Sequence, residues 1–505
     1  MKKLLLPLIF MILLEGSYAN NVQISTVTST VNAGYTTVNF NISWENSWRG
    51  GPAANYDAIW VFMKYKDENA QFHHLNLTGA NTTAGAGLTA EVPADNKGAF
   101  IYRSADGAGN IAATAVSIGV VPQAGMRDIE VFAVEMVYVP EGSFFAGGES
   151  GYSAGGTTGF PFKITSATPP GLGNASGRLY DPRLGGLLTL NANFPTGYNG
   201  FYMMKYELSQ AGYRDFFNNI QNTYFSINER SDLTDVNYSI AGTKIFNAAS
   251  LNRNFLEVRS PLGGYTLIGS DASNNNQYNE AADGEWVAAN YLLWSDIAAF
   301  LDWAALRPMT ELEYEKAARG PYDDQPAFVA TGTNYSPPSD LAIINNGMAN
   351  ETVDNLNVNT NYINSSEMGI AGPLRNGFAA TATSGRMKAG ASYYGIMELS
   401  GNLWEPAVTT GNAAGRSFTG ELGDGELDTY GRANAFGWPG KTNNSNDLQE
   451  AGYVAKTNIS GIATKGGSFA ETVTESRVAH LDIPPSWPTS RADLSNYGCR
   501  GVRQK

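Results

Sequence analysis

The chain has 505 residues, of which 43% are hydrophobic and 16% charged, so it can bury a sizeable core and is not a disordered chain. Its formal net charge of −14 at pH 7 would repel the phosphate backbone of a nucleic acid and an anionic membrane surface. Nucleic acid is therefore not expected as a partner. Loops rich in Gly and Asn, together with the acidic balance, favour divalent cations, because such loops supply oxygen ligands.

The N-terminus has the order of residues that is typical of an export signal. Lys2 and Lys3 precede an apolar run at 4–14 that is too short to span a bilayer, and small residues follow at 17 and 19. We expect a signal peptide at 1–19, cleaved between Ala19 and Asn20, and a secreted or cell-surface protein. The alternative is a buried N-terminal helix. No later apolar stretch is long enough to predict a transmembrane span.

Residues 20–121 are predicted to form an all-β sandwich of immunoglobulin-like size. Apolar and polar residues alternate from Val38 to Trp44, which is the period of a strand with one buried face. Further strands are expected at 58–65, 72–77, 99–103 and 115–120, a spacing typical of a sandwich whose topology stays open. A linker is expected at 122–126. A second domain at 127–505 then opens with a strand at 129–139.

Helices are predicted in the second domain from capping residues and apolar spacing. Ser209 would cap one helix, with apolar residues at 213, 216, 217 and 220. Ser295 would cap another, with apolar residues at 297, 300, 301 and 304. Thr310 and Glu313 form a capping box for a third, which ends at Gly320.

Two features point to functional surface. Aromatic residues gather in the segment Trp44–Arg49 and at Trp60, where they form either a stacking platform for sugars or part of the sandwich core. The stretches 222–285 and 405–460 show no sustained periodicity, which predicts long loops.

Six segments of the second domain, in the same order, resemble the formylglycine-generating enzyme (sulfatase-modifying factor) family. They are MVYVPEGSF (136–144), FYMMKYELSQAGYRDFF (201–217), RPMTELEYEKAARG (307–320), YGIMELSGNLWE (394–405), KGGSF (465–469) and NYGCR (496–500). The resemblance implies an α+β fold similar to C-type lectins over residues 127–505. Such a fold has little regular secondary structure, a few helices, and loops held by hydrogen bonds and calcium.

The resemblance also locates the chemistry that family members use to oxidise a substrate cysteine. Those members bind copper through two cysteines, and the corresponding positions here are Glu471 and Ser476. A carboxylate and a hydroxyl are hard ligands that do not hold Cu(I), so these are degenerate catalytic positions and copper is not expected. The only cysteine is Cys499, which rules out an intramolecular disulfide. We expect it to be a small buried hydrophobe, with a reactive thiol as the alternative.

A second branch of the family binds iron through three histidines. The histidines of this chain are His73, His74 and His480. Adjacent residues of a strand point to opposite faces, so His73 and His74 are not expected to chelate one ion together, and His480 lies in the other predicted domain. Iron is therefore not expected.

The resemblance implies two calcium sites. In the better one, Glu398 and Glu405 would supply carboxylates, and Gly401 and Leu403 would supply backbone carbonyls, although Pro406 replaces an aromatic residue that the family carries at the far end of this loop.

The weaker site would use the side chains of Asn350 and Asn376 and the carbonyls of Glu351 and Phe378. Asn376 stands where the family often has Asp, which removes a charge and weakens the expected binding. For both sites the alternative is a hydrogen-bonded turn without metal.

Together these features favour a secreted, non-catalytic surface protein, a pseudoenzyme stabilised by calcium. It would bind an extracellular ligand or partner protein, or build an extracellular assembly, self-assembly included. Two alternatives stay open: an oxidase of the formylglycine-generating type with an atypical site, and a hydrolase that uses carboxylates. The loss of both thiols favours binding over catalysis.

Overall fold

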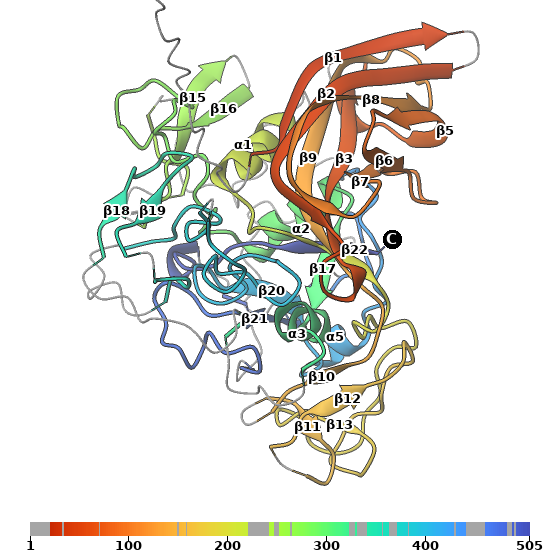
Figure 1. Ribbon diagram of the computed structural model, residues 1–505, viewed down its shortest axis with the longest axis vertical. Coiled ribbons are helices and arrows are strands. Elements are labelled where there is room, and N and C mark those ends of the chain that lie inside the picture. Colours follow the sequence, from red (N-terminus) through yellow and green to blue (C-terminus); the bar gives the residue numbers. More distant parts are fainter. Residues whose placement is uncertain are drawn as a thin grey trace, which may run out of the picture.

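The computed structural model, shown in Figure 1, is mostly β with few helices, which confirms the β-rich fold expected from the sequence. It describes residues 21–32, 35–69, 71–148, 151–157, 159–220, 242–246, 252–262, 265–322, 329–330, 341–355, 357–362, 371–381, 383–428, 431–440, 460–481, 487–488 and 491–504. The predicted signal peptide lies outside these residues. Of the helices in the described part of the chain, none has the length and apolar character needed to cross a membrane.

The N-terminal part of the chain consists of antiparallel strands around an apolar core. The strands are β1 (Gln23–Asn32), β2 (Tyr35–Arg49), β3 (Tyr56–Lys66), β4 (Phe72–His74), β5 (Leu77–Ala84), β6 (Leu88–Glu91), β7 (Ala99–Arg103) and β8 (Gly107–Val120). One group pairs in the order β1–β2–β8–β5, and the other in the order β6–β7–β3. Side chains from β2, β3, β7 and β8 fill the core between them, among them Phe40, Ile101 and Ile118. The strands predicted at 38–44, 58–65 and 99–103 are confirmed, whereas the one predicted at 72–77 is divided between β4 and β5.

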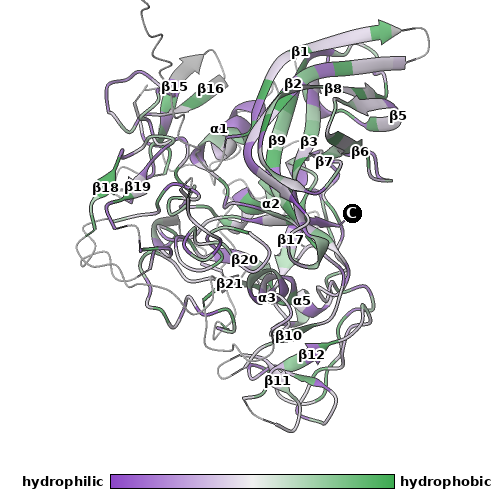
Figure 2. Cartoon of the chain, in the orientation of Figure 1, coloured by the Kyte–Doolittle hydropathy of each residue, from purple (hydrophilic) through white to green (hydrophobic). Residues whose placement is uncertain are grey.

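Strand β3 is buried on both faces. Ile59 and Val61 point into the N-terminal core, whereas Trp60 and Phe62 belong to the large core of the C-terminal part. The ring of Phe62 meets that of Trp303 edge-on, with ring centroids 5.0 Å apart. Figure 2 shows hydrophobic residues along β3 and its neighbour β9 (Arg127–Val139). The two parts of the chain therefore share apolar packing.

Strand β9 joins both parts in one sheet. It pairs with β3 along most of its length, and its C-terminal end pairs with β14 (Phe201–Met204). The sheet continues through β22 (Gly501–Gln504), β17 (Arg307–Thr310), β20 (Glu405–Val408) and β21 (Ile462–Lys465). Strands β17 and β20 are parallel, and the other neighbours are antiparallel. Residues 122–126, expected as a linker, are the short connection between β8 and β9.

The helices are α1 (Gln210–Asn219), α2 (Trp294–Trp303), α3 (Glu311–Arg319) and the short α5 (Ala413–Arg416), with 3-10 turns at Pro52–Ala54 and Arg491–Asp493. Ser209 caps α1 as predicted, since its hydroxyl accepts from Gly212 N at 3.1 Å. The capping box of Thr310 and Glu313 is also confirmed, and α3 ends at Gly320 with a φ of 68°.

The predicted cap of α2 is wrong. The helix starts before Ser295, with Leu293 as its N-cap residue. The carboxylate of Asp296 accepts from Leu293 N at 2.8 Å, so it satisfies a backbone donor at this end and Ser295 is not needed as a cap.

Short hairpins complete the C-terminal part. They are β10 (Phe144–Ala146) with β12 (Phe162–Ile164), β11 (Ser153–Ala154) with β13 (Leu179–Tyr180), β15 (Leu256–Leu262) with β16 (Tyr265–Ser270), and β18 (Ile343–Ile344) with β19 (Thr352–Val353). The β15–β16 hairpin lies in 222–285, where only loops were expected, so that expectation is wrong for these residues. A register shift between Val258 and Ser260 breaks the alternation by which a strand is recognised.

Candidate functional site

The segments that carry the family resemblance meet in one half of the sheet. Five of them contribute residues to β9, β14, β17, β20 and β21, and the sixth, 496–500, leads directly into β22; these six strands are consecutive neighbours. A buried arginine ties three of them together: Arg500 donates from Nε to Glu405 at 2.7 Å and from its other nitrogens to the carbonyls of Met204 and Met397 at 2.8 Å. The loops around this arginine hold the predicted metal ligands.

Glu471, the first degenerate catalytic position, is partly buried and held by polar neighbours. Its Oε1 accepts from Asn496 Nδ2 at 3.1 Å and lies 3.4 Å from Trp404 Nε1. The ring of His480 lies 6.0 Å from that of Trp404, between centroids. Burial lowers the pKa of His480 to about 4, so this imidazole is neutral at pH 7.

Ser476, the second degenerate position, lies in a close-packed turn. It is fully buried, and its carbonyl accepts from Ser400 Oγ at 2.8 Å. A Cβ atom added to Gly467 would come within 2.8 Å of Ser476 N, so the two segments pack closely through their backbones. The hydroxyl itself lies 3.4 Å from the carbonyl oxygen of Thr472.

Cys499 is fully buried in the main core, which confirms the prediction of a small buried hydrophobe. Burial raises the pKa of its thiol well above the ordinary value. A thiol that stays protonated is a poor nucleophile and a poor metal ligand.

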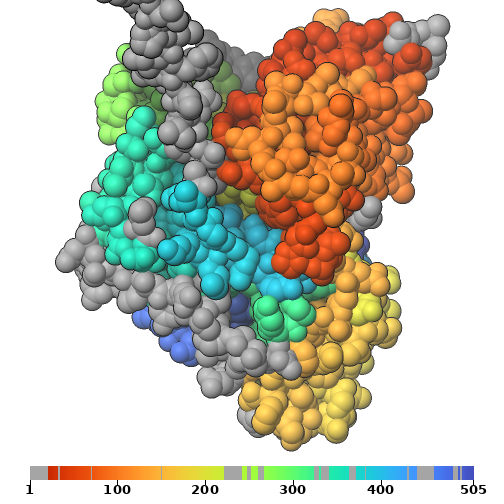
Figure 3. All heavy atoms as spheres, viewed as in Figure 1, coloured from red at the N-terminus to blue at the C-terminus, as the bar shows by residue number. Residues whose placement is uncertain are grey.

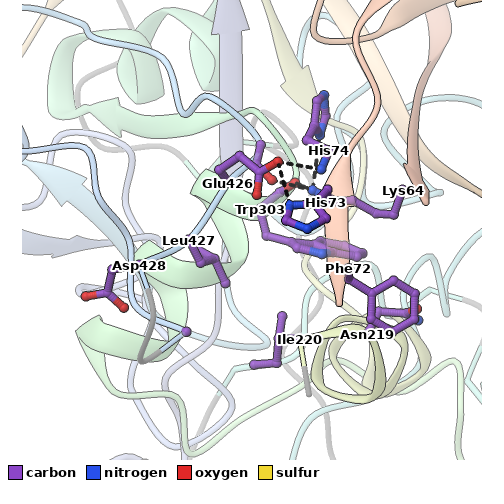
Figure 4. A pocket seen from close by; sticks show the side chains of 12 residues that line it. Lys64, Phe72, His73, His74, Asn219, Ile220, Trp303, Glu426, Leu427 and Asp428 are labelled. Carbon is purple, nitrogen blue, oxygen red and sulfur yellow. Dashed lines mark hydrogen bonds and ion pairs between the residues drawn. The ribbon is translucent and has the colours of Figure 1, made fainter. Parts of the chain in front are cut away.

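His73 and His74 lie in β4 beside a cavity of about 60 Å³, shown in Figure 4. The ring of His74 is buried, with Nδ1 3.1 Å from Lys64 Nζ and Nε2 2.7 Å from the carbonyl of Lys97. Both ring nitrogens of His74 are therefore engaged by the protein. Glu426 reaches this strand from the C-terminal part: its Oε1 accepts from His74 N at 2.7 Å and lies 3.9 Å from His73 Nδ1.

The amino group of the neighbouring Lys64 is buried between the two parts. Its Nζ donates to the carbonyls of Trp303, at 2.7 Å, and Gly425. Burial lowers its pKa from 10.5 to about 7. The charged groups that face it are Glu426, Asp302, Asp424 and Lys97.

We expect the contribution of Lys64 to stability to rise with pH between about 7 and 10.5. Because the folded pKa is the lower one, the unfolded chain binds more protons in this window; the contribution is complete above pH 10.5 and is lost as the pH falls through about 7. The free energy of unfolding of the wild type relative to Lys64→Met should therefore increase by about 4 kcal/mol from neutral to alkaline pH. Urea denaturation across this range measures it. Lys388→Met, at an exposed lysine, should keep the wild-type pH dependence. A difference that is the same at every pH would contradict the expected titration.

Arg375 stands among the residues of the weaker predicted calcium site. Its guanidinium donates to the carbonyls of Glu351 at 2.7 Å, Asn376 at 2.9 Å and Gly377 at 2.8 Å. Glu351 O is one of the oxygens expected to bind the ion. Asn376 Oδ1 is buried without a hydrogen-bond partner, and Asn350 is only partly buried.

The other carbonyl of this set and a neighbouring carboxylate are also bound by protein donors. The carbonyl of Phe378 accepts from Thr352 Oγ1 at 2.9 Å. The carboxylate of Glu351 accepts from Arg253 Nη1 at 3.1 Å and from Arg375 N at 2.9 Å. Two guanidinium cations at this place oppose a further cation, so the residues in this arrangement do not fit calcium.

The better predicted site retains two buried carboxylate oxygens without hydrogen-bond partners. Glu398 Oε1 accepts from Gly377 N at 2.9 Å and Glu405 Oε1 accepts from Arg500, whereas the Oε2 atom of each has no partner. Burial raises the pKa of Glu398 to about 8 and that of Glu405 to about 7. A hard divalent cation would satisfy oxygens of this kind, but here it would lie beside the guanidinium of Arg500, which already pairs with Glu405.

The turn that carries the other predicted ligands of this site is tightly fixed. Gly401 and Asn402 have φ values of 80° and 62°, and a Cβ atom on Gly401 would meet the carbonyl of Asn361 at 2.3 Å. Leu403 N donates to Glu207 at 3.0 Å. In the described part of the chain, no three His, Cys, Asp or Glu side chains come together as a possible metal site. The better predicted site has only two carboxylate side chains, and its other two ligands would be backbone carbonyls, so it is not such a group of three.

A pocket of about 300 Å³ lies where the N-terminal part meets the C-terminal part, and we call it the seam pocket. Its described lining residues are Asn46, Trp48, Gly51, Pro52, Asn55, Lys205, Tyr206, Ala380, Thr381, Ser384, Arg386, Ala389, Ala391, Tyr393, Tyr394, Gly395 and Met397. Figure 3 shows the red N-terminal corner lying against the cyan surface of the C-terminal part. The aromatic cluster noted in the sequence is thus divided: Trp44 and Trp60 are core residues, and Trp48 lines the pocket.

Comparison with known families gives the class of the chain. A family model described as "Sulfatase-modifying factor enzyme 1-like domain" matches residues 130–505. The match begins within β9 and includes every later strand. The chain therefore belongs to the formylglycine-generating enzyme (sulfatase-modifying factor) family. No curated protein matches it.

Sequence reasoning missed three buried charged residues that shape these sites. Lys205 and Glu207 follow directly on the apolar strand β14, and a charge pair at the end of an apolar run was an available signal. Arg375 had no such signal, because the carbonyl of Glu351 that it binds comes from a different loop.

Proposed function

We propose that this protein is a secreted, non-catalytic member of its family that binds an extracellular ligand or partner protein. The observation that supports this most is the chemistry at the two degenerate positions. Glu471 is a carboxylate held by Asn496, and Ser476 is a hydroxyl in a close-packed turn. The single thiol of the chain, Cys499, lies in the core instead. Oxygen ligands of this kind do not hold Cu(I).

Within this proposal, calcium binds at one place only. Glu398 and Glu405 would hold it, with the carbonyls of Gly401 and Leu403, and the ion would supply the positive charge that the two unpartnered carboxylate oxygens lack. At the other place Arg375 supplies the charge. The fold would then be a β-sandwich joined to a C-type-lectin-like domain, exported by the signal at 1–19 to the cell surface or beyond.

Loading with copper tests the non-catalytic assignment. The protein, supplied with Cu(I) and a peptide that carries a sulfatase-type cysteine, should leave the peptide unchanged in mass, because two thiolate ligands are missing. The double variant Glu471→Cys with Ser476→Cys should bind Cu(I) more tightly than the wild type, and Ser417→Cys, a single thiol placed at an exposed serine, is the control. Conversion of the peptide cysteine by the wild type would refute the proposal in favour of an oxidase with an atypical site.

A further inference from the structure

The seam pocket is formed in part by residues outside the family domain. Residues 46–55 come from the corner between β2 and β3, whereas the family match begins at residue 130. The remainder comes from Lys205 and Tyr206, after β14, and from the loop at 380–397. The N-terminal part therefore adds a wall that the family domain alone does not have.

An irregular strand aims Trp48 at this pocket. The register of β2 with β8 shifts twice between Ile42 and Ser47, and Asn46 has a φ of 52°. Bulges of this kind redirect the side chains that follow, which separates Trp48 from the core position of Trp44. A Cβ atom on Gly395 would lie 2.9 Å from the Trp48 ring, so the ring packs directly on this backbone.

Lys205 holds two aromatic rings in place. Its Nζ lies 5.1 Å from the ring centroid of Trp48 and 5.2 Å from that of Tyr206. Glu135 balances the charge of this ammonium through a 3.0 Å ion pair. Lys205 thus helps to fix the positions of the Trp48 and Tyr206 rings, and its charge is already paired with Glu135.

Arg386 is the other cation of the pocket, and it is exposed. Its Nη1 donates to the carbonyl of Ala391 at 3.2 Å, which anchors the guanidinium at the rim and uses one of its five N–H donors. Among the described residues that line the pocket, none is Asp or Glu. The electrostatic preference at this rim is therefore for an anion.

The inner wall is fixed by a buried amide side chain. Asn55 is fully buried, and its Nδ2 donates to the carbonyl of Tyr394. Its Oδ1 is buried without a hydrogen-bond partner. A buried acceptor of this kind costs free energy until a donor reaches it. This oxygen lies against Gly51 and is covered by protein, so a bound molecule does not contact it.

We propose that the seam pocket binds a carboxylated sugar of the uronic-acid type, an inference that rests on the proposed function as an extracellular binding protein. The sugar's apolar face stacks on the ring of Trp48, and the carboxylate pairs with Arg386. A guanidinium binds a carboxylate through two parallel hydrogen bonds, which a neutral sugar cannot offer. A pocket of about 300 Å³ is at the lower end of small-molecule sites, which suits one sugar ring and its immediate neighbour.

Binding of methyl β-D-glucuronide and its neutral counterpart, methyl β-D-glucoside, tests the proposal by calorimetry or ligand-observed NMR. The wild type should prefer the glucuronide. Arg386→Gln should weaken glucuronide binding about tenfold or more and leave glucoside binding nearly unchanged, because a charged hydrogen-bond pair is lost. Lys388→Gln removes the same charge two residues away, outside the lining, and should bind like the wild type. Trp48→Phe, which keeps an aromatic ring, should bind both glycosides better than Trp48→Ala.

Equal affinity of the wild type for the two glycosides, or an unchanged glucuronide affinity in Arg386→Gln, would overturn the assignment. Binding of neither glycoside would overturn it as well. None of these results would alter the outcome of the copper experiment, so a failure of the pocket assignment is distinguishable from a failure of the proposed function.

Discussion

Replacing Arg375 by alanine should lower the free energy of unfolding by about 3–5 kcal/mol. The side chain is almost fully buried and donates to three carbonyl oxygens, of Glu351, Asn376 and Gly377. Each of these would lose a donor in a place that water reaches poorly. Because backbone carbonyls are hard ligands, the vacated space should also become a place for calcium. Urea denaturation with calcium and with a chelator measures both effects.

The wild type supplies the baseline for this experiment. If Glu398 and Glu405 hold an ion as proposed, a chelator should lower the melting temperature of the wild type, and Glu398→Gln should reduce that response. Arg307→Ala is the matched control, since Arg307 is a buried arginine paired with Glu313 and its removal should destabilise without changing the calcium response. If calcium stabilised Arg375→Ala no more than the wild type, Arg375 would not be standing in for an ion.

Trp60→Ala should destabilise the two parts of the chain together, by about 3–5 kcal/mol. The Trp60 ring is fully buried, packs 4.7 Å from that of Phe100 between centroids, and donates from Nε1 to the carbonyl of Ala304 at 2.9 Å. The guanidinium of Arg503 lies 4.1 Å from the ring centroid. Since Ala304 and Arg503 belong to the C-terminal part, losing these contacts should destabilise both parts of the chain.

Calorimetry distinguishes this from independent unfolding. A shared core predicts one transition that shifts as a whole to lower temperature in Trp60→Ala. Trp44→Ala is the comparison, because Trp44 packs in the N-terminal core and its indole donates to Asp57 at 3.0 Å. Two transitions, of which Trp60→Ala shifts only one, would mean that the contacts between the two parts contribute little to the free energy of unfolding.

Local patterns were sufficient for the elements whose structure depends on neighbours in sequence. The alternation around Val38 and the capping box of Thr310 with Glu313 each need only a few residues, and both are confirmed. The prediction at Ser295 was wrong because a carboxylate one residue further on competed for the same end of the helix. The family was recognisable because six of its motifs stand in order along the sequence, and a family model matches residues 130–505.

The candidate site is formed by contacts between residues far apart in the sequence, which local periodicity does not predict. The pairs Arg375 with Glu351 and Lys205 with Glu135 join residues 24 and 70 positions apart. The seam pocket requires β3 and β9 to lie side by side, which follows from tertiary packing and not from the composition of residues 122–126. The metal ligands could be named from a motif, but the arginine that competes with an ion could not.

The strand β9 has a mechanical consequence for a molecule that would be tethered at a surface. Its hydrogen-bond ladder with β3 runs from Tyr138 opposite Tyr56 to Arg127 opposite Lys66. A pull that draws the two parts away from each other along the strands would load this whole ladder in shear, so that many bonds resist at once. Two domains joined by a flexible linker would separate at small forces, whereas these two parts should keep their relative position until the pairing of β3 with β9 is broken.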